Sequence, residues 1–358
     1  MVPDGMGLSN VTSARIFKNG PNGALLYLET LSRIGYQRTY SANSIITDSA
    51  AAASAWATGE KFNNGEISCH TGGNCDSSTL PTILEWAKGK GKSTGMVVTS
   101  TVTHATPAAW GAHVYSRECE TEIGRQYIEV TGIDVILGGG IGLNTLSLCN
   151  VYPGQSISGV ITSAQSRGYE YITTKEQMNA AVVAHKKKVL GLFTSGGKTP
   201  EKFRVDPLQT YPNGEPTLAE MTATALDILE ENKKGFFLMV EGSQIDWANH
   251  NNDLTYQVSE VLAFDEAVKV VLDWINTRPL RKSNTIVIIV ADHDCGGFAV
   301  NGPYGILLNA GNLVEAGWTS TDHTGGDTII WSQGPGSQCL GKSLNNTDLY
   351  WIIRKVFK

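Results

Sequence analysis

Residues 235–250 read GFFLMVEGSQIDWANH, and they indicate the architecture of the chain. Phe236–Val240 is an unbroken apolar run, which is typical of a strand buried on both faces of a sheet. The run ends at Glu241, and Asp246 and His250 follow four residues apart. On a helix this spacing places both side chains on one face. The stretch therefore predicts a buried strand with acidic and imidazole groups at its carboxyl end.

Three further apolar runs alternate along the chain with helical patterns. The predicted buried strands are Thr94–Val98, Asp134–Leu137 and Thr285–Val290. The predicted helices are Ala50–Thr58, Leu80–Lys88, Thr217–Glu231 and Val258–Thr277, with Gly59 and Gly89 as C-caps. This alternation predicts an α/β fold, a three-layer α/β/α sandwich with a central, mostly parallel sheet. We expect residues 1–358 to form a single domain, with a surface excursion around residues 147–168.

The composition excludes several classes of partner. Among 358 residues, 28 Lys and Arg stand against 34 Asp and Glu, a formal charge of −6. This mild acidity gives no reason to expect nucleic acid or an anionic membrane as a partner. No apolar run approaches the length of a membrane span. An anionic substrate would have to be attracted locally, by metal ions or by a single Arg.

The six cysteines suggest an oxidising compartment. Cys69 and Cys75 lie six residues apart in the loop CHTGGNC, and the total is even. We therefore expect up to three disulfides. The alternative is a zinc site at Cys69, His70 and Cys75, but no fourth ligand follows at a suitable spacing.

Further metal-ligand candidates follow other predicted strands. Asp292 and His293 come directly after Thr285–Val290, His323 lies in a polar loop, and Asp4 lies in PDGMG. Each of these alone is more often a turn or cap residue. Together they favour a metal site, because mixed Asp and His ligation suits zinc and all-oxygen ligation suits magnesium.

Ser49 begins an Ala-rich helix directly after Asp48. A serine there is commonly an N-cap. The free N–H groups of a helix start also suit attack on an anionic group. No GxSxG motif occurs, so a serine nucleophile would need a metal ion instead of a histidine base. The local residues leave both interpretations open.

A family resemblance, carried by long motifs, favours Ser49 as a nucleophile over Ser49 as a helix cap. The segment TDSAAAASAWATG around Ser49 resembles the nucleophile segment of the alkaline phosphatases. The other motifs follow in that family's order and extend over most of the chain: PDGMG, THATPAAWGAHVYSR, LGGG, LAEMTATALDIL, GFFLMVEGSQIDWANH, VADHDCGG and DHTGGD.

The resemblance implies a role for each matching residue. Ser49 would be the phosphorylated nucleophile, with Asp48 beside it, and Arg117 would grip two phosphate oxygens. Two zinc ions and one magnesium ion are implied as cofactors. The first zinc would be held by Asp246, His250 and His323, the second by Asp4, Asp292, His293 and Ser49, and magnesium by Asp4, Thr106 and Glu241.

The implied activity is hydrolysis of small phosphate monoesters through a phosphoserine, with net retention at phosphorus and an alkaline pH optimum. Inorganic phosphate would inhibit as product. The resemblance also implies a periplasmic or secreted mature chain and leaves a homodimer open. The alternatives are a phosphodiesterase or sulfatase on the same scaffold, and a secreted phosphate-binding protein without turnover.

This chain departs from the family pattern at several positions. His104 and Trp247 lie where well-known bacterial members resemble each other in having Asp and Lys, which leaves open whether the third site holds magnesium or zinc. Cys295 lies two residues after His293, and we expect a disulfide to Cys339, with a free thiol as the alternative. Only two residues precede PDGMG where family members have an apolar strand, so we expect a trimmed N-terminus.

Overall fold

A six-stranded parallel sheet in the order β1-β7-β3-β4-β6-β5 forms the centre of the computed structural model. Its strands are β1 Val2–Pro3, β3 Ser93–Val98, β4 Val135–Gly138, β5 Glu170–Ile172, β6 Val189–Leu192 and β7 Phe236–Gly242. The structure describes residues 1–73, 75, 78, 80–146, 149, 156–204 and 214–357. The expected runs in β3, β4 and β7 are strands, as predicted.

A second sheet continues the first. It has the order β14-β2-β13-β8 and consists of β2 Arg33–Arg38, β8 Val287–Val290, β13 Thr328–Gln333 and β14 Ser343–Asn345. Strand β13 is antiparallel to both of its neighbours. The backbone of Met1 joins the two sheets, because its amino group donates to the Ile288 carbonyl (2.6 Å) and its carbonyl accepts from the Val290 N–H (3.1 Å). The C-terminal ends of β1 and β8 therefore lie close together.

Side chains of the central strands alternate between two apolar clusters. Met96 and Val98 of β3 belong to one cluster, and Val97 belongs to the other. In β4, Ile136 faces the first cluster, and its neighbours face the second. Because side chains alternate across a strand, both faces of the sheet are buried, which accounts for the unbroken apolar runs in the sequence.

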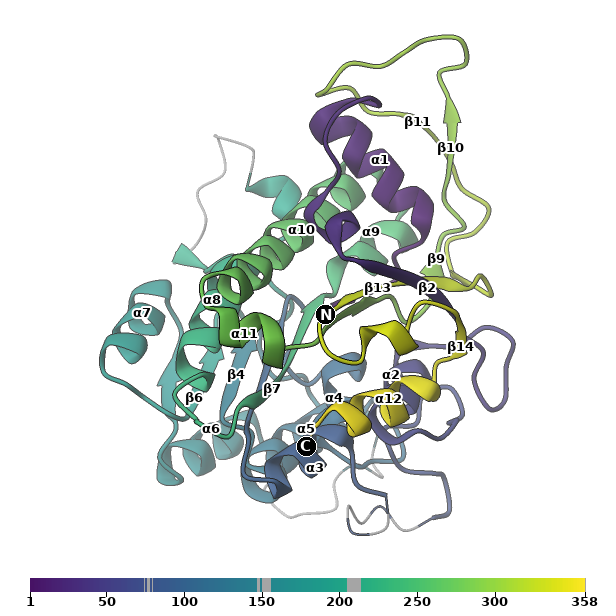
Figure 1. The fold of residues 1–358 in the computed structure, drawn as a ribbon. Coiled ribbons are helices and arrows are strands. Elements are labelled where there is room, and N and C mark those ends of the chain that lie inside the picture. Colours follow the sequence, from purple (N-terminus) through teal and green to yellow (C-terminus); the bar gives the residue numbers. More distant parts are fainter. Residues whose placement is uncertain are drawn as a thin grey trace.

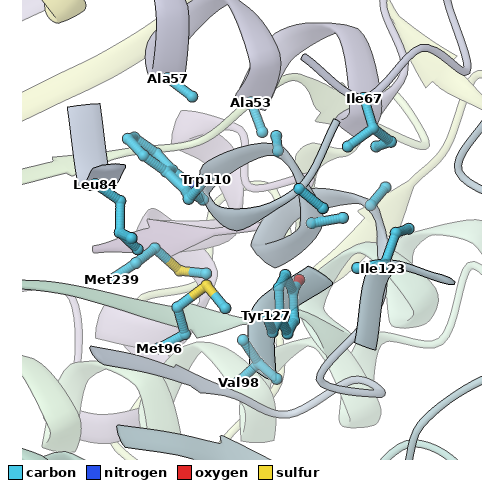
Figure 2. Close-up of a cluster of buried hydrophobic side chains, with 14 of the residues drawn as sticks. Ala53, Ala57, Ile67, Leu84, Met96, Val98, Trp110, Ile123, Tyr127 and Met239 are labelled. Atoms are coloured by element: carbon cyan, nitrogen blue, oxygen red, sulfur yellow. The ribbon is translucent and has the colours of Figure 1, made fainter. Parts of the chain in front are cut away.

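Helices cover both faces, so the fold is the predicted three-layer sandwich (Figure 1). Helices that contribute to the first cluster are α2 Ser49–Thr58, α3 Ile83–Gly89, α4 Ala105–Gly111, α5 Glu120–Gln126, α6 Ile157–Ser166 and α12 Asp348–Val356. Those that contribute to the second include α1 Leu8–Asn19, α7 Lys175–Val183, α8 Leu218–Leu229 and α10 Leu254–Asn276. Figure 2 shows Met96 and Met239 of the sheet packed below Leu84, Trp110 and the α2 alanines.

The remaining elements are short. They are α9 Gln244–His250, α11 Pro279–Asn284, η1 Tyr27–Thr30, η2 Tyr127–Thr131, η4 Glu201–Phe203, η6 Ser337–Cys339, and the two-stranded pairs β9 Asp294–Cys295 with β12 His323–Thr324 and β10 Ala299–Gly302 with β11 Glu315–Gly317. Figure 1 shows β10 and β11 beyond α1, at the end of the molecule.

Helix ends follow their capping residues. Helix α3 starts at Ile83, later than predicted, because Thr82 caps it and forms a capping box with Glu85. Helix α10 starts four residues earlier than predicted, because Asp253 accepts from the Tyr256 N–H (3.0 Å). Gly59 is the predicted left-handed C-cap.

The prediction for Gly89 is wrong. Gly89 lies inside α3, and Gly91, with φ of +76°, adopts the conformation that favours glycine.

Two disulfides form among the described residues, Cys69–Cys75 and Cys119–Cys149. The first excludes the alternative zinc site at Cys69 and Cys75. The expectation of a Cys295–Cys339 disulfide is wrong, because both thiols are free. Cys295 is buried against α9, and Cys339 is exposed on η6.

Only part of the expected surface excursion at residues 147–168 is described. Residues 147, 148 and 150–155 lie outside the described part of the chain. The following residues form α6, whose Val160 and Ala164 are buried in the first apolar cluster. This helix belongs to the packed layer because its apolar face covers the sheet.

Candidate active site

The predicted site residues meet at the C-terminal edge where the two sheets join. Asp4 follows β1, Glu241 is the second-last residue of strand β7, and Asp292 and His293 follow β8. Pairing of β1 with β7 places Val2 opposite Glu241. Thr106 comes from α4, which follows β3. Parallel strands thus bring together residues that are far apart in the sequence.

Four carboxylates are buried together at this edge. Asp4, Glu241 and Asp292 are 0% exposed and Asp246 is 5% exposed. Among the described residues, no hydrogen bond reaches either carboxylate oxygen of Asp4 or of Glu241, one oxygen each of Asp246 and Asp292, or the Thr106 hydroxyl. Unpaired buried carboxylates are costly unless a cation compensates them.

The titration behaviour reflects this crowding. Burial, and then the nearby Asp292 carboxylate, raise the pKa of Asp4 well above its usual range. The same two causes raise the pKa of Glu241 to about 8. Burial opposes ionisation of Asp292 too, but His293 and the Gly5 N–H lower its pKa. The cluster holds more negative charge than its protein neighbours neutralise.

Three histidines border the carboxylates. The Nε2 atom of His250 lies 3.3 Å from Asp246 Oδ2, and that of His323 lies 3.6 Å from Asp246 Oδ1. The Nε2 atom of His293 lies 3.1 Å from Asp292 Oδ2 and 3.7 Å from Asp4 Oδ1. The hydrogen bond to Asp246 raises the pKa of His250 to about 9.

Backbone carbonyls orient two of these rings. His323 Nδ1 donates to the Thr47 carbonyl (2.9 Å), and His250 Nδ1 donates to the Thr321 carbonyl (2.5 Å). Each contact leaves Nε2 directed at the carboxylates. Metal-binding histidines commonly have this kind of outer partner.

The donor atoms form two groups. Asp246, His250, Cys295 and His323 offer atoms that lie within 4.8 Å of one another, and so do Asp4, Asp246 and His293. The chemistry of these donors fits metal ions, with nitrogen and oxygen suited to zinc. Asp4, Thr106 and Glu241 offer only oxygen, which suits magnesium. Sequence reasoning missed Cys295 as a member of the first group, although its position two residues after His293 was a signal.

Ser49 is the first residue of α2 and is 2% exposed. Its Oγ lies 3.2 Å from His293 Nε2, at the edge of the carboxylate cluster. Asp48, not Ser49, is the N-cap, since its Oδ1 accepts from the Ala51 N–H (2.9 Å). The cap alternative for Ser49 is therefore excluded.

Arg117 is held near Ser49 by a contact with the neighbouring residue, Asp48. Its Nη1 donates to Asp48 Oδ2 (3.0 Å), which also accepts from the Gly65 N–H (3.0 Å). Its Nη2 lies 3.3 Å from His104 Nε2. The guanidinium is thus held beside the start of α2, and its side chain remains 24% exposed. The local sequence gave no signal for the Arg117–Asp48 pair, because the two residues lie on different elements.

His104 and Trp247 lie next to each other. Their rings make an edge contact with centroids 6.0 Å apart. Burial, followed by repulsion from Arg117, lowers the pKa of His104 to about 3. A Cβ on Gly197 would come within 2.5 Å of the Trp247 ring, so glycine there leaves room for the indole. Neither ring adds a positive charge to the site at neutral pH.

The α/β/α fold and the buried donor set together fit the class of metal-dependent hydrolases. A family model described as alkaline phosphatase matches residues 1–312, and the chain belongs to the alkaline phosphatase family. It is accordingly a phosphomonoesterase.

Relatives match over the whole chain. Alkaline phosphatase 4 of Bacillus subtilis is 34% identical, covering 100% of this chain and 88% of that protein. Alkaline phosphatase of Escherichia coli is 32% identical, and the match covers 99% of this chain and 84% of that protein. Streptomycin-6-phosphate phosphatase of Streptomyces griseus is 31% identical, covering 99% and 88%.

Solved structures of alkaline phosphatases have the same fold as this chain. The cold-active alkaline phosphatase of a psychrophilic Shewanella has a TM-score of 0.83 at 29% identity, covering 100% of this chain and 98% of that one. A histidine-to-glutamate mutant of the alkaline phosphatase from the Antarctic bacterium TAB5, with Mg bound in a site called M3, has a TM-score of 0.80 at 26% identity, covering 99% and 96%. In the described part of this chain, no helix has the length and apolarity needed to cross a bilayer.

Proposed function

We propose that this chain hydrolyses phosphate monoesters at alkaline pH through a phosphoserine at Ser49, with two zinc ions and one magnesium ion as cofactors. The observation that carries the proposal is the buried carboxylate cluster with unpaired oxygens beside Ser49. Such a cluster is stable when cations compensate its charge.

The donor set suggests which residues hold which ion. We assign the first zinc to Asp246, His250 and His323, whose donor atoms lie within 4.8 Å of one another. We assign the second to Asp4, Asp292, His293 and Ser49, although the donor atoms of Asp4 and His293 group with that of Asp246. Magnesium is assigned to Asp4, Thr106 and Glu241. When bound, these ions lower the pKa of nearby hydroxyl groups and stabilise negative charge on oxygen.

The residues of the chain provide the nucleophile and the binding groups. A bond forms between Ser49 Oγ and phosphorus while the bond from phosphorus to the alcohol oxygen breaks. The serine loses its proton to solvent, and the departing alcohol oxygen takes one up from solvent. The first N–H groups of α2 direct positive potential toward the phosphoryl oxygens. Arg117 offers a planar fork that binds two of those oxygens.

A water molecule then attacks phosphorus, the Ser49 Oγ–phosphorus bond breaks, and inorganic phosphate leaves. Two inversions give net retention at phosphorus. Free phosphate competes with substrate for Arg117, which makes it a product inhibitor. Trp247 is uncharged at a position facing His104, so phosphate is held less tightly than with a cation there.

The third site favours magnesium through its oxygen donors, and His104 lies two residues before Thr106, with its Nε2 3.3 Å from Arg117 Nη2. The TAB5 mutant with Mg in its M3 site, in which a histidine is replaced by glutamate, supports a link between a histidine and metal choice in this family. We infer that His104 lets zinc compete for this site.

The alternatives make different predictions. A phosphodiesterase would not need the Arg117 fork, and a non-catalytic phosphate-binding protein would not need Ser49. Streptomycin-6-phosphate phosphatase among the relatives suggests that ester preference varies, so we propose small phosphate monoesters of broad type. We also propose a single catalytic domain that acts in the periplasm or outside the cell.

The test is metal analysis and hydrolysis of an aryl phosphate by the same preparation. Protein stripped by a chelator should be inactive, and zinc with magnesium should restore turnover. An aryl phosphodiester should be a much poorer substrate. Full activity of the stripped protein, or a preference for the diester, would contradict the proposal.

A further inference from the structure

Cys295 is a buried free thiol at the edge of the proposed metal centre. Its side chain is 0% exposed, and it forms no disulfide. Its Sγ lies 3.7 Å from the Asp246 carbonyl oxygen, on the side of β9 that faces α9. None of the roles assigned above involves this sulfur.

The local structure brings Cys295 to the metal donors as one member of two matched pairs. Cys295 and His323 are directly opposite each other in the antiparallel pair of β9 and β12. Side chains of directly opposite residues lie on the same face of such a pair. Asp246 and His250 are one turn apart on α9, so they also share a face. The strand pair and the helix thus contribute two donors each.

The distances suit a single ion. The four ligand atoms of Asp246, His250, Cys295 and His323 lie within 4.8 Å of one another. Zinc binds sulfur at about 2.3 Å and nitrogen or oxygen at about 2.0–2.2 Å in a tetrahedral arrangement, so its ligand atoms lie roughly 3.3–3.8 Å apart. The four donor atoms are close enough for small side-chain movements to bring them onto one ion. Asp246 Oδ1 is a buried oxygen without a hydrogen-bond partner in this group. Its unpaired oxygen is an independent sign that an ion belongs here.

We propose that Cys295 is the fourth protein ligand of the first zinc. The thiol proton passes to solvent as the sulfur–metal bond forms. Catalytic zinc sites can accept a fifth ligand, so a fourth protein donor still leaves room for a substrate oxygen. A thiolate selects zinc over magnesium at this site, because soft sulfur ligands favour softer metals.

Cobalt substitution tests the proposal in the full chain. Stripped protein loaded with Co²⁺ should show a sulfur-to-cobalt charge-transfer band in the near ultraviolet. The Cys295→Ser variant should lose this band and bind the ion roughly 10–100-fold more weakly. The matched control is Cys339→Ser, which removes the exposed free thiol and should keep both the band and the affinity.

X-ray absorption of the zinc-loaded native chain needs no variant. It should show a sulfur neighbour at about 2.3 Å, at about half an atom per zinc if two ions are bound. Only nitrogen and oxygen neighbours, or a cobalt band that persists in folded Cys295→Ser, would overturn the proposal.

This inference rests on the proposed function, but the two fail differently. Absence of sulfur ligation with normal phosphate ester hydrolysis rejects the role of Cys295 alone. Absence of hydrolysis in zinc- and magnesium-loaded native protein rejects the proposed function, whatever the absorption spectrum shows.

Discussion

Two buried groups of charged residues in this protein are stabilised differently. In the ionic cluster, which consists of Lys198, Glu201, Arg204, Glu215 and Glu260, the chain supplies its own cations. Lys198 Nζ lies 3.1 Å from Glu215 Oε2, with both side chains at most 3% exposed. In the carboxylate cluster of Asp4, Glu241, Asp246 and Asp292, several oxygens have no hydrogen-bond partner among the described residues.

The difference indicates which group is built for function. Paired charges fix the position of a segment, here η4, since Arg204 Nε lies 2.9 Å from Glu201 Oε1. The Glu201 N–H also donates to Glu260 Oε1 (2.7 Å), which links η4 to α10. Unpaired buried carboxylates destabilise a fold unless an external cation joins them. Lys198, Glu215 and Glu260 of the ionic cluster are buried like the four carboxylates, so burial alone does not identify a site. The carboxylate cluster is distinguished by its oxygens that have no hydrogen-bond partner among the described residues.

Removal of metal should give the largest difference between the two clusters, because only the carboxylate cluster should depend on it. Chelation should abolish phosphate ester hydrolysis and lower the free energy of unfolding, by about 2.7 kcal/mol for each site held at about 100 times its Kd. Thermal melting and turnover of stripped and reloaded protein measure both effects. The Lys198→Met variant should be less stable with or without metal, yet equally dependent on zinc for activity. Equal stability of stripped and loaded native protein would contradict the comparison.

Arg117→Ala should be the next largest effect. Loss of a charge-assisted, two-pronged contact costs about 1.5–3 kcal/mol, so kcat/KM should fall roughly 10- to 200-fold. Inhibition by inorganic phosphate should weaken in parallel. Asp48 keeps its contact with the Gly65 N–H, so the fold should persist.

The matched control is Arg33→Ala, at an exposed position on β2. Steady-state kinetics with phosphate titration measures the difference. Unchanged phosphate inhibition in Arg117→Ala would exclude the clamp role.

His104→Asp should change metal choice more than rate. It adds a carboxylate next to the oxygen donors of the third site, which should tighten magnesium binding about 10- to 100-fold. Excess zinc should inhibit the native protein and inhibit the variant less. Titrating both stripped proteins with each metal, while following bound metal and activity, decides the matter. Identical magnesium dependence in the two proteins would exclude His104 from this role.

The smallest effect on activity is expected in the ionic cluster, where the change should appear in stability alone. Burial, with repulsion from Glu201, raises the pKa of Glu260 to about 8, whereas a glutamate in an unfolded chain titrates near about 4.3. The protonated form therefore contributes stability that is fully present below the unfolded pKa and is lost as pH rises through about 8. Arg204 and Lys198 partly offset this rise.

Glu260→Gln should remove this loss, which amounts to about 1.4 kcal/mol per pH unit at most. Urea unfolding of both proteins at several pH values measures the slope. Activity should not change. A variant with the same pH slope as the native chain would show that Glu260 is not its source.

Much of the central fold was predictable from sequence because its strands are buried on both faces. The apolar runs of β3, β4 and β7 gave an unambiguous pattern. Strand β2 was missed because four of its six residues are exposed, so it carries no apolar run. The joining of the two sheets through Met1 depends on a contact between residues 287 positions apart, which no local pattern contains.

The candidate site was predictable to a similar extent. Strand ends indicated Glu241, Asp292 and His293, and the structure brings them together with Ser49 and the other predicted ligands. The state of Cys295 was not predictable, since an even cysteine count favoured a disulfide, and only its burial against α9 shows otherwise. The roles of Ser49 and of the predicted ligands in catalysis and metal binding remain predictions.

The most direct test of the account is to trap the phosphorylated enzyme. Native protein loaded with zinc and magnesium, mixed with labelled phosphate or an aryl phosphate and quenched in acid, should carry the label on the peptide that contains Ser49. The Ser49→Ala variant should carry no label and should lose at least about 10³-fold in kcat, since it lacks the nucleophile. Label on any other residue, or a native rate of turnover in Ser49→Ala, would contradict the central claim.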